Sequence, residues 1–144
     1  MVMKFFKCPV CGNVIIKCID SGVVPHCCGQ EMEELVPESM DRLIELHLPV
    51  VKCKEVKTPE CQNLYCTRVY VGEKPHPMSK EHHISFICME TKEGMEMRML
   101  PIDKPADVWF CSAEKPTAVY SYCNLHELWK EEKCKHTDKC SSDN

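Results

Sequence analysis

Residues 8–29 read CPVCGNVIIKCIDSGVVPHCCG, a stretch that carries two close pairs of cysteines. The first pair, Cys8 and Cys11, lies on a predicted tight turn, and the second pair is the adjacent Cys27 and Cys28. Four thiolates arranged as two close pairs can surround a zinc or an iron ion tetrahedrally. Adjacent residues on an extended chain point in opposite directions, so the backbone has to bend at the second pair if both sulfurs bind one ion. The stretch therefore predicts a four-cysteine metal site.

The module that holds these cysteines is short, and we place it at residues 1–36. A piece of this size cannot bury enough apolar surface to fold by hydrophobic burial alone, so it needs the metal as a staple. Structural thiolate sites supply roughly 10 kcal/mol or more of folding free energy. A purely structural zinc knuckle is the alternative to iron at this site. The acidic segment 31–41 is interpreted as a linker to the next part of the chain.

Cysteine accounts for 13 of the 144 residues, while 44% hydrophobic and 28% charged residues are typical of a globular protein with a core. The segment before Cys8 is too short for a signal peptide, and no apolar run approaches the roughly 18 residues of a membrane span. We therefore expect a cytoplasmic protein without a membrane partner, in which cysteines more often bind metal or do redox chemistry than form bridges. A net charge of −4 and a pI near 6.0 give no sign of a nucleic-acid partner.

The sequence after residue 36 has the pattern of an all-β domain, which we place at residues 37–130 and follow with a polar tail at 131–144. Several short runs of β-type residues, separated by prolines, favour a small β-sandwich. The expected strands are 64–71, 83–88, 96–100, 108–111 and 117–122. Residues 125–133 have a helical composition but could equally form a short turn.

A second group of metal-binding side chains lies in this domain. His47 and His76 stand beside prolines, His82 follows six residues after His76, and Cys123 and His126 are three residues apart. Prolines stiffen the loops, which suits a preorganised ligand shell. One soft thiolate with several imidazoles is a donor set for iron, copper or zinc.

In this order, the motifs together resemble desulfoferrodoxin, the family of two-iron superoxide reductases. The Cys-x2-Cys-Gly-Asn and Cys-Cys-Gly motifs are similar to the desulforedoxin module. Pro75-His76-Pro77-Met78 with His82 and Ile84, followed by Cys123-Asn124-Leu125-His126 and Trp129-Lys130, is similar to a superoxide reductase core. The resemblance covers the chain except for about its last dozen residues.

The resemblance implies an immunoglobulin-like β-sandwich and two irons per chain. One would be a rubredoxin-like iron held by the four cysteines. The other would be held by four histidines in a plane and an axial cysteine: His47, His76, His82, His126 and Cys123. Glu45 would be the glutamate that can occupy the sixth position in the oxidised state. The implied reaction is one-electron reduction of superoxide to hydrogen peroxide, with a rubredoxin-like electron donor and a homodimeric protein.

One departure from the family concerns the motif Glu-Lys-His-x-Pro, which reads ELHLP at residues 45–49. Leu46 stands where the family has a lysine that lends positive charge near the open site. We expect reduced activity, or a nearby lysine that replaces this charge. The candidates are Lys52, Lys54 and Lys74.

The other cysteines have no role that the motifs explain. Those between His47 and His76 could form a further metal site, a disulfide or a redox switch: Cys53, Cys61 and Cys66. The tail offers a similar group: Cys134, His136 and Cys140. Three more are expected to point into cores as small hydrophobic side chains: Cys18, Cys88 and Cys111.

Three functions follow from these observations. The leading hypothesis is a superoxide reductase that acts at the iron bound by histidines and a cysteine. The second is a non-catalytic iron-binding electron-transfer protein, with the loss of the lysine at Leu46 as its sign. The third is a structural zinc protein in which both sites are closed.

Overall fold

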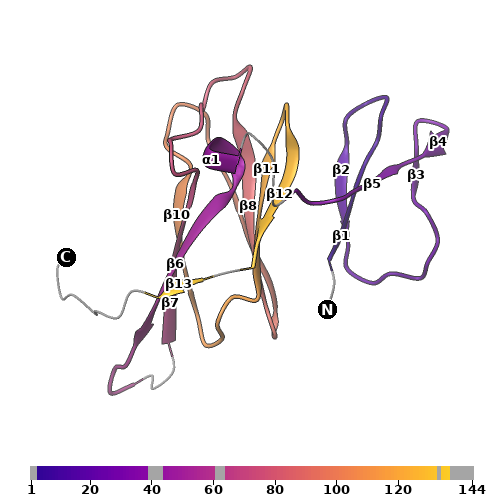
Figure 1. Cartoon of the computed structure of the whole chain (residues 1–144). Coiled ribbons are helices and arrows are strands. Elements are labelled where there is room, and N and C mark those ends of the chain that lie inside the picture. The colour runs from indigo at the N-terminus through magenta and orange to yellow at the C-terminus, as the bar shows by residue number, and fades with distance from the viewer. Residues whose placement is uncertain (1–2, 39–43, 61–63, 133, 137–144) are drawn as a thin grey trace. The chain divides into compact units, whose positions relative to one another are not determined.

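The structure is a computed structural model that describes residues 3–38, 44–60, 64–132 and 134–136. It divides into two compact units, Met1–Val36 and Pro37–Asn144. The first unit contains the strands β1 (Lys4–Lys7), β2 (Val14–Lys17), β3 (His26–Cys27), β4 (Gln30–Glu31) and β5 (Glu33–Leu35). The second contains the short helix α1 (Ile44–His47) and the strands β6 (Pro49–Val56), β7 (Leu64–Val71), β8 (Ile84–Thr91), β9 (Gly94–Met99), β10 (Asp107–Ser112), β11 (Ala118–Cys123), β12 (Glu127–Glu131) and β13 (Lys135–His136). Figure 1 shows the course of the chain.

The first unit is a three-stranded antiparallel sheet, in the order β2-β1-β5, with the separate hairpin β3-β4. Its small core consists of Phe6, Cys8 and Met32, with Cys27 packed against them. Two of these four side chains, Cys8 and Cys27, also belong to the cysteine pairs. The core therefore shares side chains with the group of four cysteines. The segment 31–41, which we interpreted as a linker, begins with the last residue of β4 and contributes β5 to this sheet, so that interpretation was wrong for residue 31 and residues 33–35.

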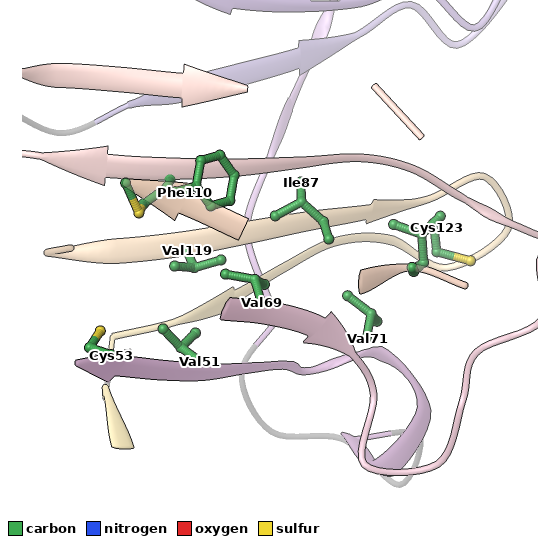
Figure 2. Packing of buried hydrophobic residues seen from close by; sticks show 11 residues of the cluster. Val51, Cys53, Val69, Val71, Ile87, Phe110, Val119 and Cys123 are labelled. Carbon is green, nitrogen blue, oxygen red and sulfur yellow. The ribbon is translucent and has the colours of Figure 1, made fainter. Parts of the chain in front are cut away.

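The second unit consists of two four-stranded sheets, in the orders β10-β7-β6-β13 and β12-β11-β8-β9. Their facing side chains form one core, shown in Figure 2. The first sheet contributes Val51, Cys53, Val69, Val71 and Phe110 to this core, and the second contributes Ile84, Ile87, Met89, Val119 and Cys123. The predicted all-β fold, a small module followed by a β-sandwich, is confirmed.

Alternation of side chains explains why these segments are strands. In β7, Thr67, Val69 and Val71 are buried, while the residues between them are partly exposed. Such a period of two is what a strand with one covered face requires. The strand β6 was missing from the sequence prediction because its charged residues conceal the same alternation, in which Val51 and Cys53 face the core.

Residues 125–133 have a helical composition, but they contain the strand β12 and no helix within their described part. Pairing explains the difference, because β12 runs antiparallel to β11 from Glu127 opposite Cys123 to Glu131 opposite Val119. Trp129 also makes a bridge to Glu38, where the second unit begins. Tertiary pairing therefore overrides the local helical preference.

The C-terminal segment contributes to the sandwich. We expected residues 131–144 to form a polar tail, but Glu131 ends β12 and β13 pairs in parallel with β6. A disulfide joins Cys134 to Cys53, across a sequence separation of 81. Residues 137–144, including Cys140, lie outside the described residues, as does Cys61.

Of the three cysteines that were expected to point into cores, one is buried and two are exposed. Cys88 is buried in β8, and its burial raises the pKa of its thiol to about 12. Cys18 and Cys111 are exposed, so the expectation was wrong for both. For Cys111 the reason is strand register, because the adjacent Phe110 takes the inward position in β10.

Candidate metal centres

Four of the cysteine sulfurs of the first unit converge on one point. Their Sγ atoms all lie within 4.8 Å of one another. The Sγ of Cys27 lies 3.7 Å from that of Cys11 and 3.9 Å from that of Cys28. Sulfurs about 2.3 Å from a tetrahedral metal ion would be about 3.8 Å apart, so the spacing fits a four-thiolate centre. The residues are those that the sequence predicts: Cys8, Cys11, Cys27 and Cys28.

Two tight turns bring these sulfurs together. The amide of Gly12 donates to the carbonyl of Cys8 over 3.0 Å, and Gly12 has a φ of 79°, which a residue with a Cβ rarely adopts. At the second pair, Cys28 (φ 54°) and Gly29 (φ 75°) form the two-residue loop of the hairpin β3-β4. Two consecutive positive φ values are those of a type I′ turn. The bend expected at the adjacent cysteines is therefore confirmed.

The electrostatics of the four thiols favour a cation among them. The backbone amide of Cys11 lowers the pKa of Cys8 to about 7. The neighbouring sulfurs, first that of Cys11 and then that of Cys8, raise the pKa of Cys28 to about 12. Four thiols packed this closely cannot all ionise unless a positive charge offsets their repulsion. A bound metal ion would supply that charge.

The second cluster lies at one end of the sandwich. His47 ends α1 just before β6, His76 and His82 lie in the connection from β7 to β8, and Cys123 ends β11. The start of one strand and the end of its antiparallel neighbour lie at the same end of the sheet. Residues that are distant in the sequence therefore come together there. Ligand atoms of these four residues all lie within 4.8 Å of one another.

His126 stands beside this group of four, in the turn between β11 and β12. Its Nδ1 is 3.7 Å from the Sγ of Cys123. The centroid of its ring is 4.5 Å from that of His47 and 5.2 Å from that of His82. All five ligands that the resemblance implied for the second iron therefore lie together.

A hydrogen bond determines which nitrogen His76 presents to the cluster. The Nδ1 of His76 lies 2.7 Å from the carbonyl oxygen of Pro77, so it carries the proton and donates. The Nε2 of His76 then points at the Sγ of Cys123, 3.5 Å away. His126 instead faces this thiol through its Nδ1. The Nε2 of His76 and the Nδ1 of His126 therefore both face the Sγ of Cys123.

Burial favours the uncharged form of three donors of this cluster, His76, His82 and Cys123. It lowers the pKa of His76 to about 4 and, together with the neighbouring His126, lowers the pKa of His82. It also raises the pKa of the Cys123 thiol. The buried Nε2 of His82 has no hydrogen-bond partner among the residues that the structure describes. Neutral imidazoles at His76 and His82 beside a buried thiol, with a buried nitrogen that has no partner among the described residues, fit a transition-metal ion.

Three side chains that sequence reasoning missed hold this cluster in shape. Trp129 stacks on His47, and its Nε1 donates to the carbonyl of His126 over 3.1 Å. The hydroxyl of Ser121, buried in β11, donates to the carbonyl of His47 over 3.0 Å. Asn124 ties the turn of Cys123 to the loop of His82 and His83. The sequence signals were a serine within an apolar strand and the Asn and Trp inside the motif 123–130.

Asn124 makes three hydrogen bonds to that loop. Its Oδ1 accepts from the amide of His83 over 2.8 Å, and its Nδ2 donates to the carbonyl of Glu81 over 2.9 Å. Its own amide donates to the carbonyl of His83 over 3.1 Å. The connection that carries His82 is therefore fastened to the turn that carries Cys123 and His126.

The surroundings of Leu46 bear on the missing lysine. Leu46 is half-buried in α1, directly before His47. The backbone of Glu45 lies in the same helix, while its side chain lies outside the described part of the chain. The ammonium groups of Lys52 and Lys54 lie over the rings of Tyr70 and Trp109.

Strand geometry then separates the candidate lysines. Lys54 is five residues into β6 from the end that carries His47, or about 17 Å along the strand. Lys74 is exposed and lies two residues before His76. Lys74 is therefore the candidate that lies nearest in sequence to a histidine of the cluster.

Comparison with known proteins shows which family this chain is similar to. The desulfoferrodoxin family profile matches residues 39–132. A desulfoferrodoxin homolog of Methanothermobacter thermautotrophicus is 35% identical over 127 residues, which cover 88% of this chain and 95% of the relative. A desulfoferrodoxin of Syntrophotalea carbinolica is 31% identical over 131 residues, which cover 90% of this chain and 96% of the relative.

A solved structure has the same fold. The crystal structure of the superoxide reductase from Treponema pallidum aligns with a TM-score of 0.72 and 25% identity, over 90% of this chain and 98% of that one. Within the described residues, none of the helices is both long and apolar enough to pass through a bilayer. The expected resemblance is confirmed, and this chain belongs to the desulfoferrodoxin family.

Proposed function

We propose that this chain is a superoxide reductase, which reduces superoxide to hydrogen peroxide at an iron held by the second cluster. The observation that carries the proposal is the convergence of three imidazoles and a buried thiol within 4.8 Å, in a chain of this family. The proposed ligands of this iron are His47, His76, His82, His126 and Cys123. A ferrous ion in this site would supply one electron to superoxide, which takes up two protons to become hydrogen peroxide.

The protein's own residues prepare the site for this chemistry. His76 and Cys123 are almost completely buried, which shields the cluster on the side of the sandwich core. The thiol is the softest donor of the set and raises the electron density at a bound metal. Five protein donors leave a six-coordinate ion one position for a small anion. Glu45, two residues before His47, is the proposed group that occupies this position in the oxidised state.

We further propose iron at the four-cysteine site and return of the electron by a rubredoxin-like donor protein. A one-electron reduction consumes one electron for each superoxide, so the cycle requires such a donor. The proposed assembly is a homodimer, which sedimentation velocity tests: a sedimenting mass near 33 kDa, twice the 16.6 kDa of one chain, supports it, and 16.6 kDa contradicts it.

Pulse radiolysis of the reduced, iron-loaded protein tests the activity. We expect rapid decay of superoxide in the wild type and loss of this decay in Cys123→Ser. Cys88→Ala is the matched control, because Cys88 is also a buried thiol of the second sheet but lies outside both clusters. Metal content and circular dichroism show whether each variant folds. Equal superoxide decay in Cys123→Ser and the wild type would contradict the proposal.

The alternative is an iron-binding electron-transfer protein without this activity, and Leu46 is the residue that favours it. Under this alternative, the iron-loaded protein is coloured and reversibly reducible but removes superoxide no faster than buffer does. A colourless protein that takes up zinc when iron is offered would contradict both functions and would support a structural zinc protein.

A further inference from the structure

Two cysteines outside both clusters face each other across the first sheet of the sandwich. Cys66 in β7 and Cys111 in β10 are directly paired in the antiparallel register. Their Sγ atoms are 3.2 Å apart. Neither thiol belongs to a metal-binding group within the described residues. The proposed function makes no use of this pair.

The pair lies on the outer face of the sheet. Thr67 and Phe110, the neighbours of the two cysteines along their strands, are buried at 1% and 0% exposure. Side chains alternate along a strand, so Cys66 and Cys111 point away from the core. Cys111 is exposed and Cys66 is half-buried. Small oxidants in solution can therefore reach the pair.

The second cluster is distant from these thiols. Cys66 lies five residues before Val71, where β7 reaches the end of the sandwich that carries His76. At about 3.4 Å per residue, this is about 17 Å along the strand. Oxidation of the pair is thus separable from metal binding at the histidines.

The backbone already has the geometry of a disulfide. Directly opposed residues on antiparallel strands have Cα atoms about 4.5–5.5 Å apart, within the range of about 4.4–6.8 Å that disulfides span. A sulfur–sulfur bond is about 2.05 Å long, so the two sulfurs need to approach by only about 1 Å. Side-chain rotation can supply this without a change in strand register.

We propose that Cys66 and Cys111 are a redox-active dithiol that hydrogen peroxide closes to a cross-strand disulfide. One thiol attacks the peroxide, which breaks the O–O bond, forms a sulfenic acid and releases water. The second thiol then attacks the sulfenic sulfur and releases a second water as the S–S bond forms. In total, two thiols and one hydrogen peroxide give one disulfide and two waters, and an external dithiol reductant reopens the bridge.

The pair is thus a site at which this protein reduces hydrogen peroxide to water. Only the internal source of the peroxide rests on the proposed superoxide reductase activity, because added peroxide oxidises the pair equally well. An exposed cysteine with no close thiol among the described residues, such as Cys18, would instead stop at the sulfenic acid or be oxidised further. The second thiol at 3.2 Å is what makes the reaction reversible.

The test uses the full chain with zinc in both metal sites, so that neither iron chemistry nor superoxide reduction contributes. The protein is reduced, freed of reductant and treated with two equivalents of hydrogen peroxide, one for the Cys53–Cys134 bridge that the reduction opens and one for the proposed pair. The pH is near 8, because free cysteine has a pKa of about 8.5. Remaining thiols are alkylated, and fragmentation of the peptides locates any bridge. We expect a Cys66–Cys111 bridge, with one peroxide consumed per bridge.

Three variants make the result specific. Cys66→Ser and Cys111→Ser should each abolish the bridge, since each leaves one thiol that stops at the sulfenic acid or is oxidised further. Cys61→Ser is the matched control from the same segment and should retain the bridge. Alkylation of Cys66 and Cys111 to the same extent as Cys18 would overturn the proposal. So would oxidation of the two thiols to separate sulfinic acids, or a bridge that uses Cys61.

Discussion

The indole of Trp129 stacks on the imidazole of His47, with ring centroids 4.9 Å apart and an angle of 16° between the planes. Both side chains are buried, at 1% and 0% exposure. Because Trp129 also donates a hydrogen bond to the carbonyl of His126, one side chain orients two histidines of the second cluster. Residues that orient metal ligands in this way commonly matter almost as much as the ligands.

We predict that Trp129→Phe weakens metal binding at the second cluster by about tenfold, because phenylalanine keeps an aromatic ring but loses the indole N–H. Competition with a chelator, with the four-cysteine site loaded, measures the change. Trp109→Phe is the control, since Trp109 is half-exposed at 52% and lies in β10. If both variants bind metal like the wild type, Trp129 does not orient the ligands.

Asn124→Ala should also weaken metal binding at the second cluster, by about tenfold or more. The substitution removes the side-chain hydrogen bonds to the amide of His83 and the carbonyl of Glu81, which leaves the loop of His82 less constrained. The affinity is measured by the same competition. Leu125→Ala, at an exposed position in the same turn, should leave it unchanged. Equal losses in the two variants would point to a general disturbance of the turn.

Leu46→Lys should accelerate the reaction with superoxide at low salt, because it restores a positive charge next to His47. Metal content should not change, since a leucine side chain cannot be a ligand. Pulse radiolysis at two ionic strengths checks this, because salt screens steering by charge. No change in rate at low salt would contradict the role given to the missing lysine. A loss of rate in Lys74→Ala would identify Lys74 as the existing substitute.

Binding of zinc at the second cluster, after a first equivalent has filled the four-cysteine site, should release about one proton near pH 7–8. Burial raises the pKa of Cys123, so its thiol holds a proton that zinc must displace, whereas His76, with its pKa lowered to about 4, is already neutral. The affinity should therefore fall about tenfold for each unit by which the pH is lowered in this range.

Calorimetry in buffers of different ionisation enthalpy measures the number of protons that zinc binding releases. Release of no proton would mean that the thiol is already ionised in the metal-free protein. Release of two or more would mean that imidazoles are protonated there. Either outcome would contradict the effects of burial described above.

Cys134→Ser should lower the free energy of unfolding of the second unit by about 2–4 kcal/mol. The Cys53–Cys134 disulfide closes a loop across 81 positions, and cross-linking a long loop restricts the unfolded chain. Urea unfolding measures the loss. A disulfide reductant should bring the wild type to the level of the variant and leave the variant unchanged. Equal stability of the oxidised wild type and the variant would show that the bridge does not contribute.

The sequence was sufficient for local features and for motifs. The spacing of the first pair and the adjacency of Cys27 and Cys28 predicted both the four-cysteine cluster and the bend at the second pair. The boundaries of β7 follow directly from its β-branched and aromatic residues, Leu64–Val71. The histidines and Cys123 were identified by resemblance to a family, and spacing alone left iron, copper and zinc open.

Long-range contacts could not be predicted from one sequence. The hydrogen bond from Ser121 to His47 spans 74 positions, and that from His83 to Asn124 spans 41. The pairing of Cys53 with Cys134 depends on β13 joining the edge of the first sheet, which no local pattern indicates. Residues 125–133 show the same limit, because their pairing with β11 overrides their composition.

The stoichiometry of the reaction with superoxide tests the central claim most directly. A limiting amount of superoxide is mixed with excess iron-loaded protein in the ferrous form, with the Cys66–Cys111 bridge closed beforehand so that this pair consumes no peroxide, and hydrogen peroxide and dioxygen are both measured. Reduction predicts one hydrogen peroxide for each superoxide and no dioxygen, with one electron lost by the protein. Half a hydrogen peroxide and half a dioxygen for each superoxide would be dismutation and would contradict the account.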